Sequence, residues 1–159
     1  MAPKGSEGPI TVCFAASSGG HLEQILMLEP LMKKYDGFIV TEETGYGSPL
    51  PVRHYRLNQV NRREALFIFK MIVNAFVSLG ILLRERPGIV VCTGVLATIP
   101  LCLIGKLFGA KLVYIESFAK TDSPTVSGKL LHRFADRFYV QWESMLGVYP
   151  DARYVGGIY

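Results

Sequence analysis

The sequence predicts an α/β fold, a Rossmann-like open sheet of parallel strands with helices between them. Short apolar runs alternate along the chain with longer segments of helical periodicity, which is the pattern of repeated βα units. Some of these runs, such as Gly88–Thr93, are apolar without interruption, as expected for strands covered on both faces. The first run leads through a turn of small residues, Ser17–Gly20, into a helix, and open α/β sheets bind their ligands beyond such strand ends.

The alternation predicts six strands and five helices in one domain, residues 10–159. The strands are predicted at residues 10–16, 37–41, 52–57, 89–93, 111–115 and 137–141, and several of them are continuous apolar runs. The intervening helices are predicted at 21–34, 62–86, 95–108, 124–135 and 142–148. No repeat or linker divides the 159 residues, and the polar start, residues 1–9, is predicted to be flexible.

Charge and cysteine content narrow the function classes. The chain carries a net charge of +4, which suits phosphorylated ligands, anionic lipid or nucleic acid. Cys13, Cys92 and Cys102 lie in apolar stretches without metal-type spacing, so they indicate structural thiols in a reducing compartment and no metal site. The first eight residues lack the apolar core of a signal peptide. These observations predict a protein on the cytosolic side.

The predicted helix at 62–86 is unusually hydrophobic. Its stretch Leu66–Leu83 has 18 residues, close to the roughly 20 that span a bilayer. Spanning is excluded because it would place two halves of one sheet on opposite sides of the membrane. Two interpretations stay open, a core crossover helix and a helix lying on the membrane surface between basic flanks. The flanking residues are Arg62, Arg63, Arg84 and Arg86, and those assigned to lipid contact are Phe67, Ile68, Lys70 and Phe76.

The candidate site gathers at the carboxyl edge of the predicted sheet. Gly19 and Gly20 allow a ligand to approach the first turn closely, and His21 places an imidazole there. The alternative is a tight turn in which Ser17 or Ser18 caps the helix. The other residues expected to meet a phosphate or an acceptor are Ser18, Glu23, Arg62, Arg63, Thr93 and Gly94. Glu116, at the end of the fifth strand, is either a second base or a structural carboxylate.

Six motifs in order resemble one family. They are Ser18–His21, Thr93–Pro100, Tyr114–Lys120, Ser127–Leu130, Ala135–Trp142, and Tyr149-Pro150 with Gly156–Tyr159. Together they resemble the PssD/CpsF/EpsE-type subunits of bacterial exopolysaccharide and capsule glycosyltransferases. Those subunits are related to the membrane-associated subunit of the eukaryotic transferase that adds the second GlcNAc to dolichol-linked sugar.

The resemblance implies half of a split GT-B glycosyltransferase, similar to the acceptor-binding N-terminal domain of MurG-type enzymes. A separate PssE-like subunit would supply the half that holds the UDP-sugar, so this chain is expected to be inactive alone. The acceptor would be a saccharide linked to undecaprenyl pyrophosphate at the cytoplasmic face of the cell membrane. His21 matches the Gly-Gly-His loop of one-chain relatives and is expected to act as the general base, with no metal or cofactor.

Three other functions compete with this one. The chain could be a non-catalytic membrane anchor and activator of a PssE-like catalytic subunit, with His21 structural. A dinucleotide-dependent oxidoreductase is disfavoured because no GxGxxG follows the first strand, and Glu42-Glu43 stand before Thr44–Gly47 without the rest of that fingerprint. Nucleic-acid binding is disfavoured because the basic residues cluster beside the most hydrophobic segment.

Overall fold

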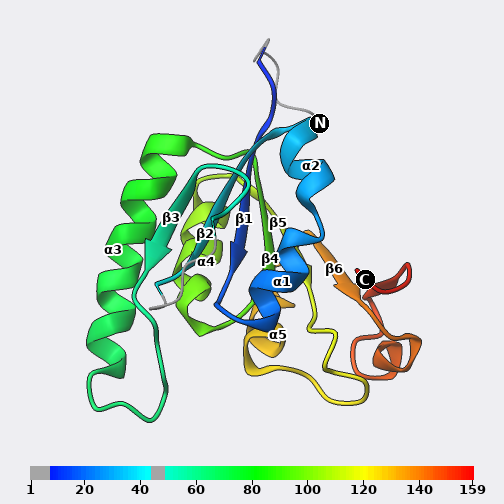
Figure 1. The fold of residues 1–159 in the computed structure, drawn as a ribbon. Coiled ribbons are helices and arrows are strands. Elements are labelled where there is room, and N and C mark those ends of the chain that lie inside the picture. The colour runs from blue at the N-terminus through cyan, green and yellow to red at the C-terminus, as the bar shows by residue number, and fades with distance from the viewer. Residues whose placement is uncertain (1–7, 44–48) are drawn as a thin grey trace.

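The computed structural model, which describes residues 8–43 and 49–159, contains one sheet of parallel strands (Figure 1). The strand order is β3-β2-β1-β4-β5-β6-β7, and every neighbouring pair is parallel. The predicted fold class is therefore confirmed. The strands are β1 (Thr11–Ala16), β2 (Asp36–Glu42), β3 (His54–Leu57), β4 (Ile89–Gly94), β5 (Lys111–Ile115), β6 (Arg137–Val140) and β7 (Arg153–Tyr154).

The helices follow the predicted order with shorter bounds. The segment predicted as one helix at 21–34 is two, because Pro30 lies in the first turn of the second and cannot continue a helix that precedes it. The segment predicted at 142–148 is a 3-10 helix. The helices are α1 (Gly20–Leu26), α2 (Glu29–Lys34), α3 (Phe67–Glu85), α4 (Ile99–Leu107) and α5 (Val126–Leu131), with 3-10 turns at Leu96–Thr98 and Glu143–Gly147.

The two faces of the sheet are covered unequally. Helices α1 and α2 pack on one face, against Phe14, Ile39 and their neighbours. Helices α3 and α4 pack on the other, over a core that includes Cys92 and Leu112. All three cysteines are buried there as free thiols, as predicted. In Figure 1, α3 runs along the outer side of β3 and α4, while the C-terminus lies beyond β6 at the opposite side.

At the amino ends of the strands, two carboxylates bind side chains of neighbouring elements. Asp36, the first residue of β2, accepts two hydrogen bonds from Arg53 at 2.6 and 3.0 Å, and Arg53 also pairs with Glu85 at the end of α3. Asp136, just before β6, accepts from Lys106 at 2.5 Å and from the Leu112 N–H at 2.8 Å. The loops that form the candidate site lie at the opposite edge, at the carboxyl ends of the strands.

Most of the predicted flexible start, residues 1–7, lies outside the described residues, as do Thr44–Gly47. From residue 8 the chain leads directly into β1.

Candidate functional site

The predicted turn lies at the point where the strand order reverses. β1 has β2 on one side and β4 on the other, so the loops after β1 and β4 leave the sheet side by side. The Ser17 N–H donates to the Gly94 carbonyl at 2.7 Å and joins the two loops directly. Gly19 has φ +73°, a conformation that favours glycine, and it positions His21 in the first turn of α1. Sheets of this order bind ligands at this crevice.

His21 and Thr93 hold each other by two hydrogen bonds. The Thr93 hydroxyl donates to the His21 carbonyl at 2.9 Å, and the His21 Nδ1 lies 2.7 Å from the Thr93 carbonyl oxygen. Because a carbonyl oxygen only accepts, Nδ1 must carry the proton and donate. In the neutral ring the other nitrogen, Nε2, then carries the free lone pair. This is the arrangement that a general base requires.

Gly94 makes room for the His21 ring. Its φ is +106°, and a Cβ at this position would lie 3.4 Å from Nδ1 and Cε1 of His21 and 3.3 Å from the Tyr114 hydroxyl. Any larger residue would be strained and would push on the imidazole. The predicted group of His21, Thr93 and Gly94 is thus brought together.

Glu42 accepts hydrogen bonds from the same turn, a role that the sequence did not indicate. Its carboxylate, 5% exposed at the end of β2, accepts from the N–H and the hydroxyl of Ser18, both at 3.2 Å. Its other oxygen accepts from the Val60 N–H at 3.2 Å. Ser18 therefore does not cap α1, which has no side-chain cap. The acidic residue at this position in dinucleotide-binding folds contacts a ribose, whereas here it holds loops together.

Glu116 lies at the predicted end of β5, but its side chain is fully buried. One oxygen accepts from the Ser117 N–H and the Thr125 hydroxyl at 2.9 and 2.8 Å. The other accepts from the Thr125 N–H and the Tyr149 hydroxyl at 3.2 and 3.0 Å. A carboxylate with four donors and no exposed surface favours the structural interpretation of Glu116 over the second-base expectation.

The Glu116 network lies behind the His21 site. Thr125, which donates to Glu116, lies 3.3 Å from the Tyr114 hydroxyl, and that hydroxyl faces the position beside Gly94. Burial, with the Glu116 carboxylate as a second cause, raises the pKa of Tyr114 well above its usual value. The phenol therefore stays protonated. Glu116 is thus linked to the candidate site through Thr125 and Tyr114.

Two buried glutamines, which sequence reasoning did not assign to the site, join α1 to the far strands. Gln24, in the helix that carries His21, accepts from Gln141 Nε2 at 2.6 Å and from the Phe118 N–H at 3.1 Å. Gln141 also donates to the Glu116 carbonyl at 2.9 Å. Gln24 is more than 90 positions away from Phe118 and Gln141 in the sequence, so no local pattern predicts these contacts.

The other predicted phosphate or acceptor residues are exposed. Arg62 and Arg63 lie in the loop before α3, and Glu23 lies on the outer side of α1. Within the described part of the chain, none of these three side chains takes part in an ion pair. No group of three or more metal-ligating side chains occurs in the same residues.

Helix α3 is inverted with respect to an ordinary amphipathic helix. The polar Asn74 and Ser78 are buried against the protein together with Ile81 and Leu82. The exposed side is apolar, with Ile68 and Phe76 each 70% exposed. Asn74 accepts from the Asn58 N–H and donates to the Asn58 carbonyl, both at 2.9 Å. The core-helix interpretation therefore accounts for one narrow side of α3 only.

The other two residues assigned to lipid contact lie differently. Phe67 is partly buried, and Lys70 is paired with Glu64 rather than free. Conversely, the apolar surface extends further than the sequence analysis assigned, through Phe69 and Leu83 to the end of α4, where Leu107 is 83% and Phe108 57% exposed. Length and composition alone would allow α3 to cross a membrane, and both its ends lead back to strands of one sheet.

Solved structures share this fold. MurG from Acinetobacter baumannii matches 94% of the chain with a TM-score of 0.74 at 17% identity, and the match covers 46% of that chain. UDP-N-acetylglucosamine 2-epimerase from Rickettsia bellii matches 94% with a TM-score of 0.72 at 12% identity, over 45% of its length. The chain thus spans less than half of each structure. The fold is the Rossmann-like class found in GT-B proteins.

Sequence relatives identify the family. Residues 51–158 match the family described as "Oligosaccharide biosynthesis protein Alg14 like". The human "UDP-N-acetylglucosamine transferase subunit ALG14" is 25% identical over 94% of this chain and 83% of its own. The Schizosaccharomyces pombe subunit of the same name is 41% identical over 44% of this chain and 36% of its own. The chain belongs to the Alg14 family.

Proposed function

We propose that this protein is the acceptor-binding, membrane-contacting subunit of a two-component glycosyltransferase. A partner subunit would hold the UDP-sugar, and this chain would hold a saccharide linked to a polyprenyl pyrophosphate. The relatives named above are subunits of a UDP-N-acetylglucosamine transferase, which makes UDP-GlcNAc the donor to test first. In the proposed transfer the UDP-sugar is a substrate, and this chain contributes no metal or cofactor.

The arrangement of His21 is the observation that carries the proposal. Nδ1 is committed to the Thr93 carbonyl, and His21 stands at the crevice between β1 and β4. In the proposed step the acceptor hydroxyl gives its proton to Nε2 while its oxygen attacks C1 of the donor sugar. The bond from C1 to the UDP oxygen breaks, and UDP leaves with the electron pair. Attack from the face opposite UDP inverts the configuration at C1.

The membrane contact is proposed for the outer side of α3 and the end of α4. Apolar residues there are exposed while the helix buries polar ones, the reverse of what water favours. Arg62 and Arg63 at one end of α3 would meet anionic headgroups or the acceptor pyrophosphate, and Arg84 and Arg86 at the other end would meet headgroups. The cytoplasmic face of the cell membrane is the proposed location, since all three thiols are free.

For the biosynthetic pathway we propose only the reaction that this protein would support. The family description speaks of oligosaccharide biosynthesis, and the resemblance to PssD/CpsF/EpsE-type subunits suggests exopolysaccharide or capsule synthesis with a PssE-like partner. Both settings require the same reaction, transfer of a sugar to a hydroxyl of a membrane-held saccharide.

The alternative function is a non-catalytic anchor that recruits and activates the catalytic subunit. One observation favours it: of the two side chains expected to act as bases, Glu116 is buried and saturated, so the chemistry depends on His21 alone.

The substitution His21→Ala in the complex with the partner tests the proposal. Partner binding should persist, while transfer from UDP-GlcNAc to a polyprenyl-pyrophosphate saccharide should fall by about 10²- to 10⁴-fold, the usual contribution of a general base. Thr93→Val, which removes only the hydroxyl bond, serves as the graded control and should lose less. Unchanged turnover in His21→Ala would favour the anchor function.

A further inference from the structure

The turn after β1 is already supplied with negative charge by the protein itself. The N–H and the hydroxyl of Ser18 both donate to the buried carboxylate of Glu42, and the Ser17 N–H donates to the Gly94 carbonyl. Glu23 adds a second carboxylate in the first turn of α1. A phosphate at this turn would meet two like charges and would find the donors of Ser18 occupied. The turn therefore suits the uncharged hydroxyls of a saccharide better than a phosphate.

Glu42 also joins this turn to the loop before α3. Its second oxygen accepts from the Val60 N–H at 3.2 Å, so the loop begins directly beside the turn. The loop is ordered by Asn61, which accepts from the Arg63 N–H at 3.0 Å through its side chain and from the Glu64 N–H at 3.1 Å through its carbonyl. Figure 1 shows this loop at the same end of the sheet as the start of α1.

From Val60 the loop leads through two cations to the apolar surface of α3. Arg62 and Arg63 are exposed, and neither forms an ion pair within residues 8–43 and 49–159. Leu66 is then 63% and Ile68 70% exposed. The surface thus changes from hydrogen-bonding groups to guanidinium groups and then to apolar side chains. The proposed acceptor has its parts in the same order, which are a saccharide, a pyrophosphate and a polyprenyl chain.

We propose that Arg62 and Arg63 bind the pyrophosphate of the acceptor, and that Glu42 determines specificity by keeping phosphate off the turn. The saccharide then reaches the turn and His21, while the polyprenyl chain lies along the start of α3. Guanidinium groups suit this role because each can donate two parallel hydrogen bonds to phosphate oxygens. The inference rests on the proposed function and assigns the two arginines to the acceptor rather than to membrane headgroups.

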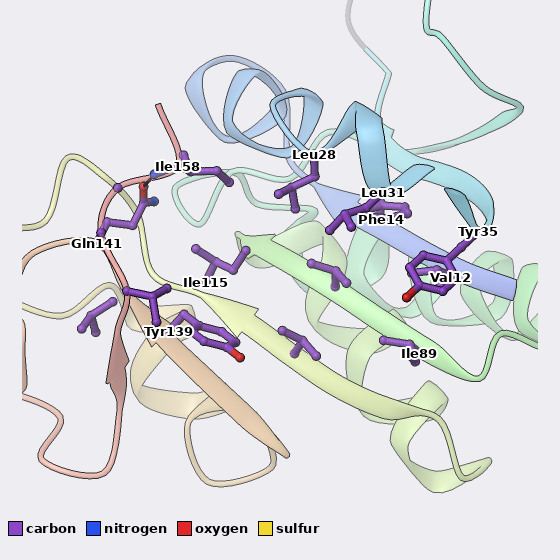
Figure 2. Close-up of a pocket in the computed structure, with 16 residues that line it drawn as sticks. Val12, Phe14, Leu28, Leu31, Tyr35, Ile89, Ile115, Tyr139, Gln141 and Ile158 are labelled. Atoms are coloured by element: carbon purple, nitrogen blue, oxygen red, sulfur yellow. Dashed lines mark hydrogen bonds between the residues drawn. The ribbon is translucent and has the colours of Figure 1, made fainter. Parts of the chain in front are cut away.

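Two other surfaces suit the pyrophosphate less well. Lys120 follows β5 on the other side of the crevice, whereas α3 begins on the side of β3. The groove beside α2, which Figure 2 shows, has a volume of about 530 Å³ and an apolar floor. None of the described residues that line this groove is a lysine or an arginine, so it offers no cation to a phosphate.

The double substitution Arg62→Gln with Arg63→Gln tests the pyrophosphate site. The complex is formed with the partner, identified as the chain whose addition to the full-length protein gives transfer from UDP-GlcNAc. The assay uses neutral detergent, which carries no anionic headgroups. The KM for a polyprenyl-pyrophosphate saccharide and the inhibition constant of inorganic pyrophosphate should both rise at least about tenfold, since a hydrogen bond to a charged group contributes roughly that factor.

The kcat of this variant should change little, because the lost contacts are made before and during the reaction alike. Arg133→Gln, at an exposed arginine just after α5, is the matched control and should keep both constants.

Glu42→Gln tests the specificity role, because glutamine keeps the shape of the side chain and removes its charge. Inorganic pyrophosphate should inhibit transfer by this variant at least about threefold more strongly than by the unchanged protein, since the like charge that opposed it is gone. A merely structural defect would not strengthen this inhibition. Circular dichroism checks the folding of the variant, and the exposed arginine variants test the site independently of it.

The outcomes separate this inference from the proposed function. Unchanged KM and unchanged inhibition in the arginine variant would overturn the pyrophosphate site. If that variant loses only its binding to phosphatidylcholine–phosphatidylglycerol vesicles, the arginines meet headgroups and the inference is wrong. It is also wrong if Lys120→Gln causes the selective loss instead, or if Glu42→Gln is inhibited no more strongly. If no added chain ever yields transfer, the proposed function fails, and the inference fails with it.

Discussion

One carbonyl oxygen, that of Thr93, determines which nitrogen of His21 can act. The oxygen accepts from Nδ1 and so leaves Nε2 as the unprotonated nitrogen of the neutral ring, while the hydroxyl of the same residue donates to the His21 carbonyl. A His fixed at two points is preorganised, which matters because a misplaced base loses much of its effect.

At the same scale, Gly94→Ala should harm both folding and activity. The substitution places a methyl group at φ +106° and 3.4 Å from the imidazole, so we expect a loss of about 2 kcal/mol in the free energy of unfolding. Urea denaturation measures this loss, and transfer assays of the complex should show reduced turnover. Gly20→Ala is the control, because Gly20 has no atom within 4 Å of the added Cβ and no positive φ. Equal stability of both variants would contradict the strain argument.

The residues of the site were predictable where the signal is local. The turn Ser18–His21 and the strand end Thr93-Gly94 follow from small residues after apolar runs, and the structure joins them. Glu116 was located correctly along the sheet edge. Its surroundings were not predictable, because Thr125 and Tyr149 reach it from 9 and 33 residues away.

At the scale of elements, α3 combines a strong sequence signal with a misleading one. Its length and hydrophobicity were evident, and its crossover position between β3 and β4 was predicted. In the sequence, Asn74 and Ser78 interrupt an apolar run, and in the structure their spacing of four places both on the buried side. The helix is apolar nearly all round, so periodicity alone could not show which side faces the protein.

Replacing the outer side of α3 should separate membrane contact from folding. Ile68→Ser with Phe76→Ser should lower binding to phosphatidylcholine–phosphatidylglycerol vesicles at least about tenfold, because two large apolar side chains no longer leave water. The free energy of unfolding should change by less than about 0.5 kcal/mol, as for exposed sites.

Val126→Ser, 53% exposed on α5, is the control for vesicle binding and should be neutral. Vesicle binding unchanged in the double variant would remove α3 from the membrane contact, and loss of folding would support the core-helix interpretation instead.

At the scale of the whole molecule, the ion-paired carboxylates Asp36 and Asp136 lie at one edge of the sheet and the candidate site lies at the other. Hydrogen bonds from Arg53 lower the pKa of Asp36. Partial burial opposes ionisation of Asp136, but its bonds from Lys106 and the Leu112 N–H outweigh this and lower its pKa as well. The fold class and the order of elements were predictable from alternation. The unequal covering of the two sheet faces was not predictable, because it results from the handedness of the crossovers along the whole sheet.

These carboxylates predict loss of stability in acid. A carboxyl with a lowered pKa in the folded state stabilises the fold above its unfolded pKa, about 4, and this contribution disappears as the pH falls through the folded value. The urea midpoint should therefore decline between about pH 5 and pH 3.

Asp136→Asn should lower the urea midpoint at pH 7 and make its decline in acid less steep. Asp122→Asn, at an exposed position, is the control and should leave the dependence of the midpoint on pH unchanged. A decline equally steep in Asp136→Asn would show that the acid sensitivity arises elsewhere.

The pairing of Asn74 with Asn58 fixes the roll angle of α3. Successive residues are turned by about 100° around a helix axis, so a slip of a single position would rotate Ile68 and Phe76 away from their present direction. The amide prevents this slip because it satisfies both the N–H and the carbonyl of Asn58, one residue past the end of β3. One buried side chain thus sets which residues of α3 face any surface that the helix touches.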